Sequence, residues 1–213
     1  MPRMADWQAW HDEYDDPTSR LSQRLALVQQ RLREALDTRP PGPIQLLSLC
    51  AGQGRDVVGV LLDHPRARDV DAVLVEADPV NAEYARSTAE LAVRAGSISV
   101  VEGDAGQTET LVGAVPADVL LLCGIFGNIS DEDVEHTVRN CSRLCNEDAV
   151  VLWTRHPNPP DLTVSIRSWF AQSGFVELAF DAPAEMRYGV GMHRLIAEPE
   201  HFYVGLELFR FLR

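Results

Sequence analysis

The chain contains no lysine, and all nineteen of its basic residues are arginine. Without lysine there is no P-loop lysine, no Schiff-base chemistry and no lysine general base. The four cysteines show no Cys-x-x-Cys spacing, which predicts neither a metal site nor a disulfide framework and is typical of a reducing compartment. No apolar run approaches the roughly 18 residues of a membrane span, and residues 1–10 do not read as a signal peptide. These absences predict a soluble, cytoplasmic protein.

The composition is that of a globular domain. The 213 residues are 46% hydrophobic and 24% charged, so the chain is long enough and apolar enough to bury a core of its own. Thirty-two acids against nineteen bases give a formal charge of −13. Because such a body repels phosphodiester backbones and anionic lipids, we expect neither nucleic acid nor a membrane as a partner.

The N-terminal part, residues 1–38, is predicted to be a helical appendage. Five apolar residues recur there at helical spacing: Leu21, Leu25, Val28, Leu32 and Leu36. Asp16 as the N-cap and Pro17 at the first helical position are favourable for the start of this helix. A proline-rich stretch at 39–43 then separates the appendage from a domain that we place at residues 39–213.

That domain alternates between short apolar strands and helices. Strands are expected at Ile44–Cys50, Ala72–Glu76, Ile98–Val101, Val119–Cys123 and Ala149–Trp153, and helices at Asp56–Leu62, Val80–Ala95, Asp131–Leu144 and Leu162–Ser173. Continuous apolar strands separated by helices predict an α/β fold with a doubly wound, mostly parallel sheet. The tail predicts antiparallel strands without helices between them, at Phe175–Phe180, Gly189–Ile196 and Leu206–Leu212.

Three consecutive strand ends carry residues suited to binding a nucleoside. Gly52 and Gly54 follow the first strand, Glu76 ends the second and Asp104 follows the third. Ligands of doubly wound sheets bind at these ends, where glycines allow close approach and a carboxylate can accept from both ribose hydroxyls. Asp104 could accept from the adenine amine. Small residues beside the acids, Ala77 and Ala105, would leave room for the ring.

A nicotinamide cofactor is the competing interpretation. The dinucleotide fingerprint needs a third small residue three positions after Gly54, and position 57 is valine. Arg55 is the one cation in this turn. A ligand with a single ribose and no pyrophosphate therefore fits the pattern better.

From Ile44 to about Ile196 the sequence resembles the class I S-adenosylmethionine-dependent methyltransferases. The segments that carry the resemblance are Leu-Cys-Ala-Gly-Gln-Gly-Arg-Asp at 49–56, Val-Glu-Ala-Asp-Pro at 75–79, Glu-Gly-Asp-Ala at 102–105 and Ala-Asp-Val-Leu-Leu-Leu-Cys-Gly at 117–124. The resemblance implies a seven-stranded sheet whose last strand is antiparallel, and S-adenosylmethionine as the cofactor. By this match Glu76 would hold the ribose and Asp104 the adenine. The methionine moiety and the methyl group would lie along residues of two turns: Cys50, Ala51, Gly52, Gly54, Cys123 and Gly124.

The chain departs from the family pattern at two places. The family usually has an acid two residues before the first glycine, where this chain has Ser48, and the first glycine itself is replaced by Cys50. The contact to the cofactor ammonium must therefore come from backbone carbonyls or elsewhere. The expected strand at Leu206–Leu212 lies beyond the seventh, and we place it as an edge strand or a dimer contact.

Catalysis by such an enzyme rests on aligning the two reactants and excluding water, with a base where the acceptor must lose a proton. His156, just after the fifth parallel strand, and His11, in the aromatic segment Trp7–Tyr14, are the candidates for that base. This segment could be a packed helix face or a lid, with Tyr14 donating to the cofactor carboxylate. Arg55 or Arg155 could pair with a carboxylate, although arginines paired at the surface are commoner.

We therefore expect a methyltransferase that acts on a small organic acceptor, as a monomer or homodimer. The loop after the fourth strand, Gly127-Asn128-Ile129-Ser130, lacks the Asn-Pro-Pro-Tyr pattern of enzymes that methylate nitrogen in bases or glutamine. The alternatives are an NAD(P)-dependent oxidoreductase on a similar sheet and a cofactor-binding protein without turnover.

Overall fold

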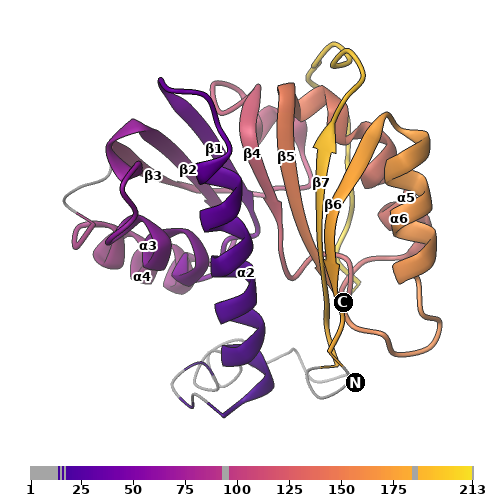
Figure 1. The fold of residues 1–213 in the computed structure, drawn as a ribbon, viewed down its shortest axis with the longest axis horizontal. Coiled ribbons are helices and arrows are strands. Elements are labelled where there is room, and N and C mark those ends of the chain that lie inside the picture. The colour runs from indigo at the N-terminus through magenta and orange to yellow at the C-terminus, as the bar shows by residue number, and fades with distance from the viewer. Residues whose placement is uncertain (1–13, 15, 17, 93–95, 184–186, 213) are drawn as a thin grey trace.

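The computed structural model describes residues 14, 16, 18–92, 96–183 and 187–212. Figure 1 shows a central twisted sheet with helices packed against it. The helices are α2 (Arg20–Asp37), α3 (Arg55–Leu61), α4 (Pro79–Ala89), α5 (Asp131–Asn140) and α6 (Thr163–Gln172), with short 3₁₀ turns η2 (Ala67–Asp69), η3 (Thr108–Leu111) and η4 (Cys141–Leu144). The strands are β1 (Ile44–Leu49), β2 (Val70–Glu76), β3 (Ser97–Glu102), β4 (Ala117–Leu122), β5 (Cys145–Arg155), β6 (Phe175–Asp181) and β7 (Gly189–Leu195).

The sheet has the order β3-β2-β1-β4-β5-β7-β6. The strands from β1 to β5 are parallel, and β7 pairs antiparallel with both β5 and β6. The chain order reverses between β1 and β4, so the crevice for a ligand is expected outside the carboxyl ends of these two strands. In Figure 1 those ends point toward the bottom of the view, where α2 begins. The predicted doubly wound fold class is confirmed.

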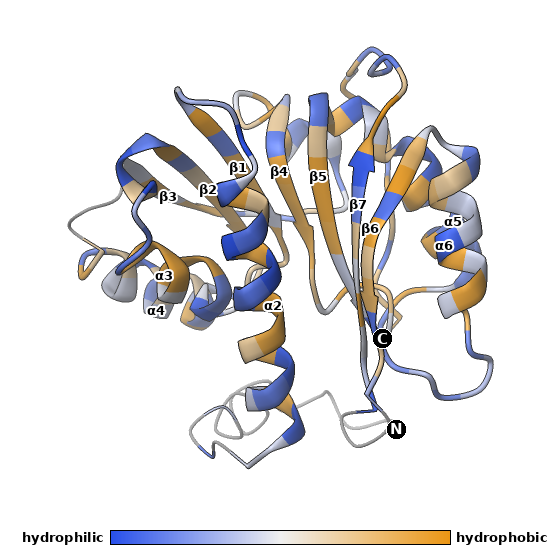
Figure 2. Ribbon diagram, viewed as in Figure 1, coloured by the Kyte–Doolittle hydropathy of each residue, from blue (hydrophilic) through white to orange (hydrophobic). Residues whose placement is uncertain are grey.

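Alternating strand residues supply two separate cores, one on each face of the sheet. Leu46 and Leu121 pack with α2, α3 and α4, whereas Leu47 and Leu122 pack with α5 and α6. Because side chains alternate between the faces of a strand, a strand covered on both sides must be apolar throughout. Figure 2 shows this as hydrophobic colour along the central strands.

Helix α2 packs directly into the first of these cores. Leu32, Ala35 and Leu36 belong to the same cluster as β1 and α3. The helix begins at Arg20, with the Ser19 hydroxyl accepting from the backbone N–H of Ser22. The predicted cap at Asp16 is therefore wrong, and this carboxylate instead accepts from the N–H of Thr18 one turn earlier. The division of the chain at residue 38 stays a prediction.

The other predicted helix starts agree closely with the structure. Ser130 caps α5 by accepting from the Asp133 N–H at 3.0 Å. Asp161 accepts from the N–H of Thr163, the first residue of α6. The expected helix over 131–144 ends at Asn140 and continues as the 3₁₀ turn η4, and α4 ends at Ala89. No helix within the described residues is long and apolar enough to cross a membrane.

The prediction of an eighth strand at Leu206–Leu212 is wrong. This segment crosses the loops after β3 and β4 and makes single bridges there, Gln107 to Glu207 and Ile129 to Phe211. Its consecutive residues Leu208 and Phe209 are both buried in the core. A regular strand sends neighbouring side chains to opposite faces, so this segment serves as a strap across the two loops and not as a sheet edge.

Among the residues that the structure describes, two histidines lie in the interior. His64 lies in a polar stretch just after α3, but it is only 4% exposed, and its Nε2 lies 3.3 Å from an Asp37 carboxylate oxygen at the end of α2. His193 is 1% exposed, and its Nδ1 accepts from the indole N–H of Trp153 at 3.2 Å. Burial lowers the pKa of His193 to about 4, and the positive charge of Arg167 acts in the same direction while Glu177 opposes it.

We expect acid to destabilise the protein through His193. In the unfolded chain this residue regains the ordinary pKa of 6.5, so between pH 6.5 and 4 the unfolded chain binds more protons. The free energy of unfolding should fall by about 2 kcal/mol between pH 7.5 and pH 5 through this residue alone. Urea unfolding at both pH values should show this loss. His193→Asn, which keeps an acceptor for Trp153, should reduce it, whereas His136→Asn on the exposed face of α5 should not. An equal loss in His193→Asn would contradict the assignment.

Candidate functional site

The turn after β1 lies in a left-handed backbone conformation at three positions. Cys50, Gly52 and Gly54 have φ angles of 53°, 56° and 68°. At Gly54 a Cβ atom would also lie only 2.9 Å from the Leu74 side chain of β2, so glycine is needed there on two grounds. Cys50 adopts a conformation that costs a non-glycine residue about 1–2 kcal/mol. This position is the one at which the sequence pattern leads us to expect glycine.

Glu76 joins the turns after β1 and β2. The residue is 9% exposed, and one carboxylate oxygen accepts from the Gly52 N–H at 2.7 Å while the other accepts from the Asp78 N–H at 2.8 Å. Asp78 in turn caps α4. A carboxylate offers about four lone-pair positions, so these two bonds leave acceptor capacity for ligand hydroxyls. The structure thus brings Glu76 and the glycine turn together.

The turn after β3 continues the same edge. The Gly103 N–H donates to the Glu76 carbonyl at 2.9 Å, and the Asp104 carboxylate accepts from the Gly106 N–H at 2.8 Å. The Asp104 side chain is exposed, Ala77 is exposed, and Ala105 is buried at 3%. A Cβ at Gly106 would lie 2.3 Å from the Phe209 carbonyl oxygen, so the C-terminal strap holds this turn closely.

The cysteine thiols at this edge remain protonated. Burial raises the pKa of Cys50 well above its ordinary value, with the negative charges of Glu76 and Asp104 adding to the effect. Burial likewise raises the pKa of Cys123, next to the end of β4. A nucleophilic cysteine needs a lowered pKa, so these two residues can line a ligand but are not set up to attack one.

The loop after β4 is fastened from β5. The Gly124 N–H donates to the Thr154 hydroxyl at 2.9 Å, and the Asn128 amide donates to the Gly124 carbonyl at 2.7 Å. Arg155 is 6% exposed and donates to the Phe126 carbonyl. Its burial lowers its pKa, an effect that Asp131 and Asp161 oppose. Two residues of β5, Thr154 and Arg155, therefore hold the backbone of the loop that is expected to lie beside the methyl group.

His156 lies at the rim of this loop. A Cβ at Gly127 would lie 3.0 Å from its Cδ2 atom, and its Nδ1 accepts from the Asn158 N–H at 3.2 Å. In the neutral ring this bond places the proton on Nε2, so the free ring nitrogen is a donor in this arrangement. His11 lies outside the described residues, as does the rest of the aromatic segment before Tyr14. The catalytic assignments of His156 and His11 stay predictions.

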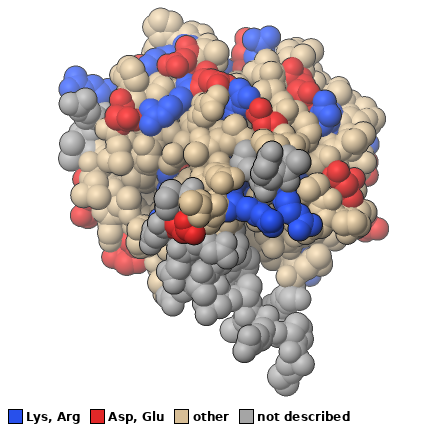
Figure 3. Space-filling view, turned by 60° about the horizontal axis from the view of Figure 1, so that its bottom comes forward, with Lys and Arg blue, Asp and Glu red and all other residues tan. Residues whose placement is uncertain are grey.

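A group of charged and aromatic side chains lies where the first turns of α2 and the start of α3 meet. The Arg24 guanidinium of α2 is 7% exposed and donates to the Tyr14 hydroxyl at 2.6 Å. The guanidinium of Arg55 lies over the rings of Tyr14 and Tyr84, 5.4 and 5.5 Å from their centres. Burial raises the pKa of Tyr14, which the charge of Arg24 partly offsets. Figure 3, turned toward this edge, shows arginines gathered near the centre of the face.

Arg24 is a site residue that the sequence did not single out. It occupies a position on the buried stripe of α2, between Leu21 and Val28. The sequence did carry a signal for it, because Arg24 is a charged residue at an apolar position of an amphipathic helix. Arginine is almost never buried without partners, so such a position indicates a polar contact in the interior.

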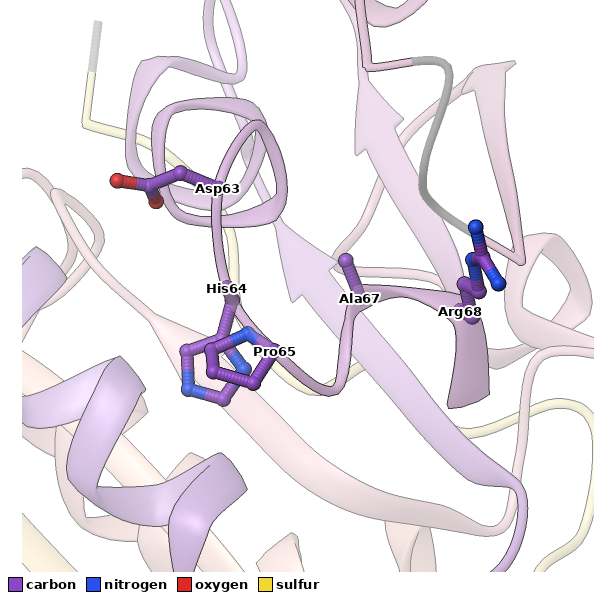
Figure 4. Close-up of a pocket in the computed structure, with 5 residues that line it drawn as sticks. All are labelled: Asp63, His64, Pro65, Ala67 and Arg68. Atoms are coloured by element: carbon purple, nitrogen blue, oxygen red, sulfur yellow. The ribbon is translucent and has the colours of Figure 1, made fainter.

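A cavity of the structure lies away from this edge of the sheet. This cavity of about 260 Å³ is lined by Asp63, His64, Pro65, Ala67 and Arg68 (Figure 4). These residues precede β2, at the amino end of the sheet, and so lie away from the turns described above. No cluster of three or more potential metal ligands occurs within the described residues.

Comparison with known proteins rests on structure alone. No family model matches the sequence, and no curated protein matches it. A magnesium protoporphyrin IX methyltransferase from Synechocystis PCC 6803, solved with bound S-adenosylmethionine, is similar with a TM-score of 0.68 and 11% identity, over 90% of this chain and 91% of that one.

Two further solved structures share the fold. An O-methyltransferase family protein from Burkholderia thailandensis matches 87% of this chain with a TM-score of 0.61 and 15% identity, and this chain covers 61% of its length. A precorrin-6y C5,15-methyltransferase from Geobacter metallireducens matches 79% of this chain and 87% of its own, with a TM-score of 0.58 and 13% identity. At these identities the likeness shows the fold.

Proposed function

Because the chain has the fold of class I S-adenosylmethionine-dependent methyltransferases, we propose that it transfers a methyl group from this cofactor to a small organic acceptor. The observation that carries the proposal is the joining of three successive strand ends by Glu76. Its carboxylate accepts from the Gly52 N–H and its carbonyl accepts from the Gly103 N–H. Glu76, the proposed ribose ligand, thus connects the glycine turn after β1 with the proposed adenine turn after β3.

Each predicted contact fits a nucleoside with one ribose. Glu76 would accept from the two ribose hydroxyls, and Asp104 from the adenine amine, with Ala77 and Ala105 beside the ring. The methionine part would lie along the turn of Cys50, Ala51, Gly52 and Gly54, next to Cys123 and Gly124. Tyr14 and Arg55, stacked together above this turn, would cover it.

The nicotinamide alternative fits the turn less well. Val57 is fully buried between α3 and the sheet, where the dinucleotide fingerprint would place a small third residue for close helix packing. A binding protein without turnover stays the other alternative.

The bound cofactor would supply an electrophilic methyl group on its sulfonium. The chain's own contribution is alignment and the exclusion of water. Thr154 and Arg155 fix the loop of Gly124–Asn128, so the backbone beside the reacting atoms is held in one geometry. His156 is the proposed group that contacts the acceptor. To act as a base, His156 must give up the hydrogen bond that its Nδ1 accepts from the Asn158 N–H, because a base needs a ring nitrogen with an available lone pair.

The acceptor class rests on charge and on the structural neighbours. A formal charge of −13 opposes nucleic-acid acceptors, and the neighbours named for magnesium protoporphyrin IX and precorrin-6y act on small organic molecules. We keep a monomer or homodimer and a cytoplasmic location as predictions.

Titration calorimetry tests the proposed function. We expect S-adenosylhomocysteine to bind in the micromolar range or tighter, and NADH and NADPH not to bind at the same concentrations. Radiolabelled S-adenosylmethionine with a panel of small oxygen, nitrogen and carbon acceptors then tests turnover. Tight binding of NADH without binding of S-adenosylhomocysteine would refute the proposal, and cofactor binding with no transfer to any acceptor would favour the binding protein.

A further inference from the structure

The strap is bonded to both halves of the proposed site. At one end the Leu208 N–H donates to the Gly106 carbonyl at 2.7 Å, and the Gly106 N–H donates to the Asp104 carboxylate at 2.8 Å. At the other end the Leu212 N–H donates to the Asn128 carbonyl at 2.8 Å. The turn after β3 carries the proposed adenine acceptor, and the loop after β4 is expected beside the methyl group. One segment therefore joins the two.

A buried threonine fastens the strap next to the turn after β3. Thr108 is fully buried, its hydroxyl accepts from the Leu206 N–H at 3.0 Å, and its own N–H donates to the Leu206 carbonyl at 3.1 Å. The Phe209 carbonyl oxygen lies so close to Gly106 that a Cβ atom there would be only 2.3 Å away. Because unpaired polar groups are costly in the interior, these bonds hold the turn and the strap in one arrangement.

The part of the strap between its two ends is short and packed. Leu208 and Phe209 are buried in the core, and the Thr137 hydroxyl of α5 donates to the Leu208 carbonyl at 2.9 Å. The chain from Leu208 to Leu212 spans about 14 Å at most, even when it is fully extended. Such a link has little slack, so the strap holds both turns when it is in place and releases both when it opens.

The loop after β4 receives one bond from the strap at a central position. Asn128 offers its carbonyl to Leu212, while its side-chain amide donates to the Gly124 carbonyl at 2.7 Å. The bridge between Ile129 and Phe211 lies directly beside this bond. A change in the hold on Asn128 therefore reaches the backbone of Gly124, which is expected to flank the methyl group.

Local opening gives this connection a thermodynamic consequence. Segments of a folded protein open locally, and the groups that they fasten are released together. Gly106 bonds both the strap and Asp104, so opening of the strap disturbs the carboxylate that would accept from the adenine amine. A ligand that binds only the fastened form lowers the population of the open form.

We infer that the strap couples the two halves of the site, so that binding of the nucleoside part holds the loop after β4 in place. Thr108 is the positioning residue at one end, and the Leu212 N–H is the positioning group at the other. The inference rests on the proposed function. It adds a segment beyond β7 to a site otherwise built from the ends of parallel strands. The adenosine part of the cofactor would thereby prepare the loop beside its own methyl group for the acceptor.

Hydrogen exchange with adenosine as the probe tests this coupling. Adenosine carries the base and the ribose but has no methionine part, so its effect on residues 123–130 must pass through the protein. S-adenosylhomocysteine carries the methionine part as well and would also contact this loop directly. Calorimetry sets the concentration of each ligand, and mass spectrometry of peptides measures the exchange.

Two substitutions at Leu212 form a matched pair. Leu212→Pro removes the N–H that bonds Asn128, whereas Leu212→Ala keeps it. The Leu212 side chain is 66% exposed, so neither substitution empties the core. At an adenosine concentration of about ten times Kd, exchange of the loop should slow about 10-fold in the unchanged protein and in Leu212→Ala. It should not slow in Leu212→Pro, while S-adenosylhomocysteine should slow it in all three.

Thr108→Val tests the other end of the strap. Valine has nearly the same shape but no hydroxyl, and we expect adenosine and S-adenosylhomocysteine to bind more weakly by the same factor of about 3- to 10-fold. The control is Thr88→Val on α4, whose hydroxyl donates to the Tyr84 carbonyl at 2.9 Å, and it should bind both ligands as the unchanged protein does. A loss of stability in Thr108→Val without a loss of affinity would mean that this residue only supports the fold.

The remaining outcomes separate the inference from the proposed function. If adenosine binds the unchanged protein without slowing exchange of the loop, or slows it equally in Leu212→Pro, the coupling through the strap is refuted while the proposed function stands. Binding of S-adenosylhomocysteine without binding of adenosine has the same meaning, because the turn after β3 then does not hold the nucleoside. If neither ligand binds, the proposed function fails as well.

Discussion

Glu76→Ala should weaken binding of S-adenosylhomocysteine by about 1.5–3 kcal/mol, the range for hydrogen bonds to a charged group. The carboxylate also holds the Gly52 and Asp78 N–H groups, so the substitution loosens both turns that face the ligand. The measurement is titration calorimetry, with a competing ligand where the affinity is high.

The control for this variant is Glu83→Ala. Glu83 lies on α4 and pairs at the surface with Arg86, so its loss should change neither the affinity nor the stability by more than about 0.5 kcal/mol. A Glu76→Ala protein that binds S-adenosylhomocysteine as the control does would remove the ribose assignment, and with it the observation on which the proposed function rests.

Phe209→Ala should lower the free energy of unfolding by about 3–5 kcal/mol, the range for removing a buried phenylalanine side chain. Phe209 is 2% exposed and packs in the core shared by β4, β5, α5 and α6. The flanking backbone holds the turn after β3 through the bond from the Leu208 N–H to the Gly106 carbonyl. Urea unfolding followed by circular dichroism measures the change.

Leu212→Ala in the same segment is the comparison, because Leu212 is 66% exposed. We expect it to cost less than about 0.5 kcal/mol. If the two variants lose the same stability, the strap does not form part of the core. A shift of the oligomeric state in Leu212→Ala alone would instead support the dimer contact that the sequence allowed.

The sequence predicts those parts of the site that lie directly at or after the end of a predicted strand. Gly54 and Glu76 could be placed because each lies at the end of a strand, and parallel strands bring their carboxyl ends to one edge. Arg24 could not be placed in this way. Its role depends on how α2 crosses α3, which is set by packing between residues far apart in the chain.

The same distinction explains the errors in the fold. Leu206–Leu212 has an apolar pattern that favours a strand, but its partners are two loops about a hundred residues earlier. His64 follows a helix in a polar stretch, yet it is buried, and its Nε2 lies beside Asp37, an acid 27 positions earlier in the chain. Local pattern predicts which elements form, whereas contacts of this kind depend on the completed packing.

The strap has a consequence for the order of assembly. It follows every strand in the chain, and yet its backbone bonds fasten the turns after β3 and β4, at Gly106 and Asn128. During synthesis the sheet can therefore form while both turns are still unfastened. The proposed nucleoside site should therefore be completed only after residues 206–212 have been synthesised, later than the bulk of the secondary structure.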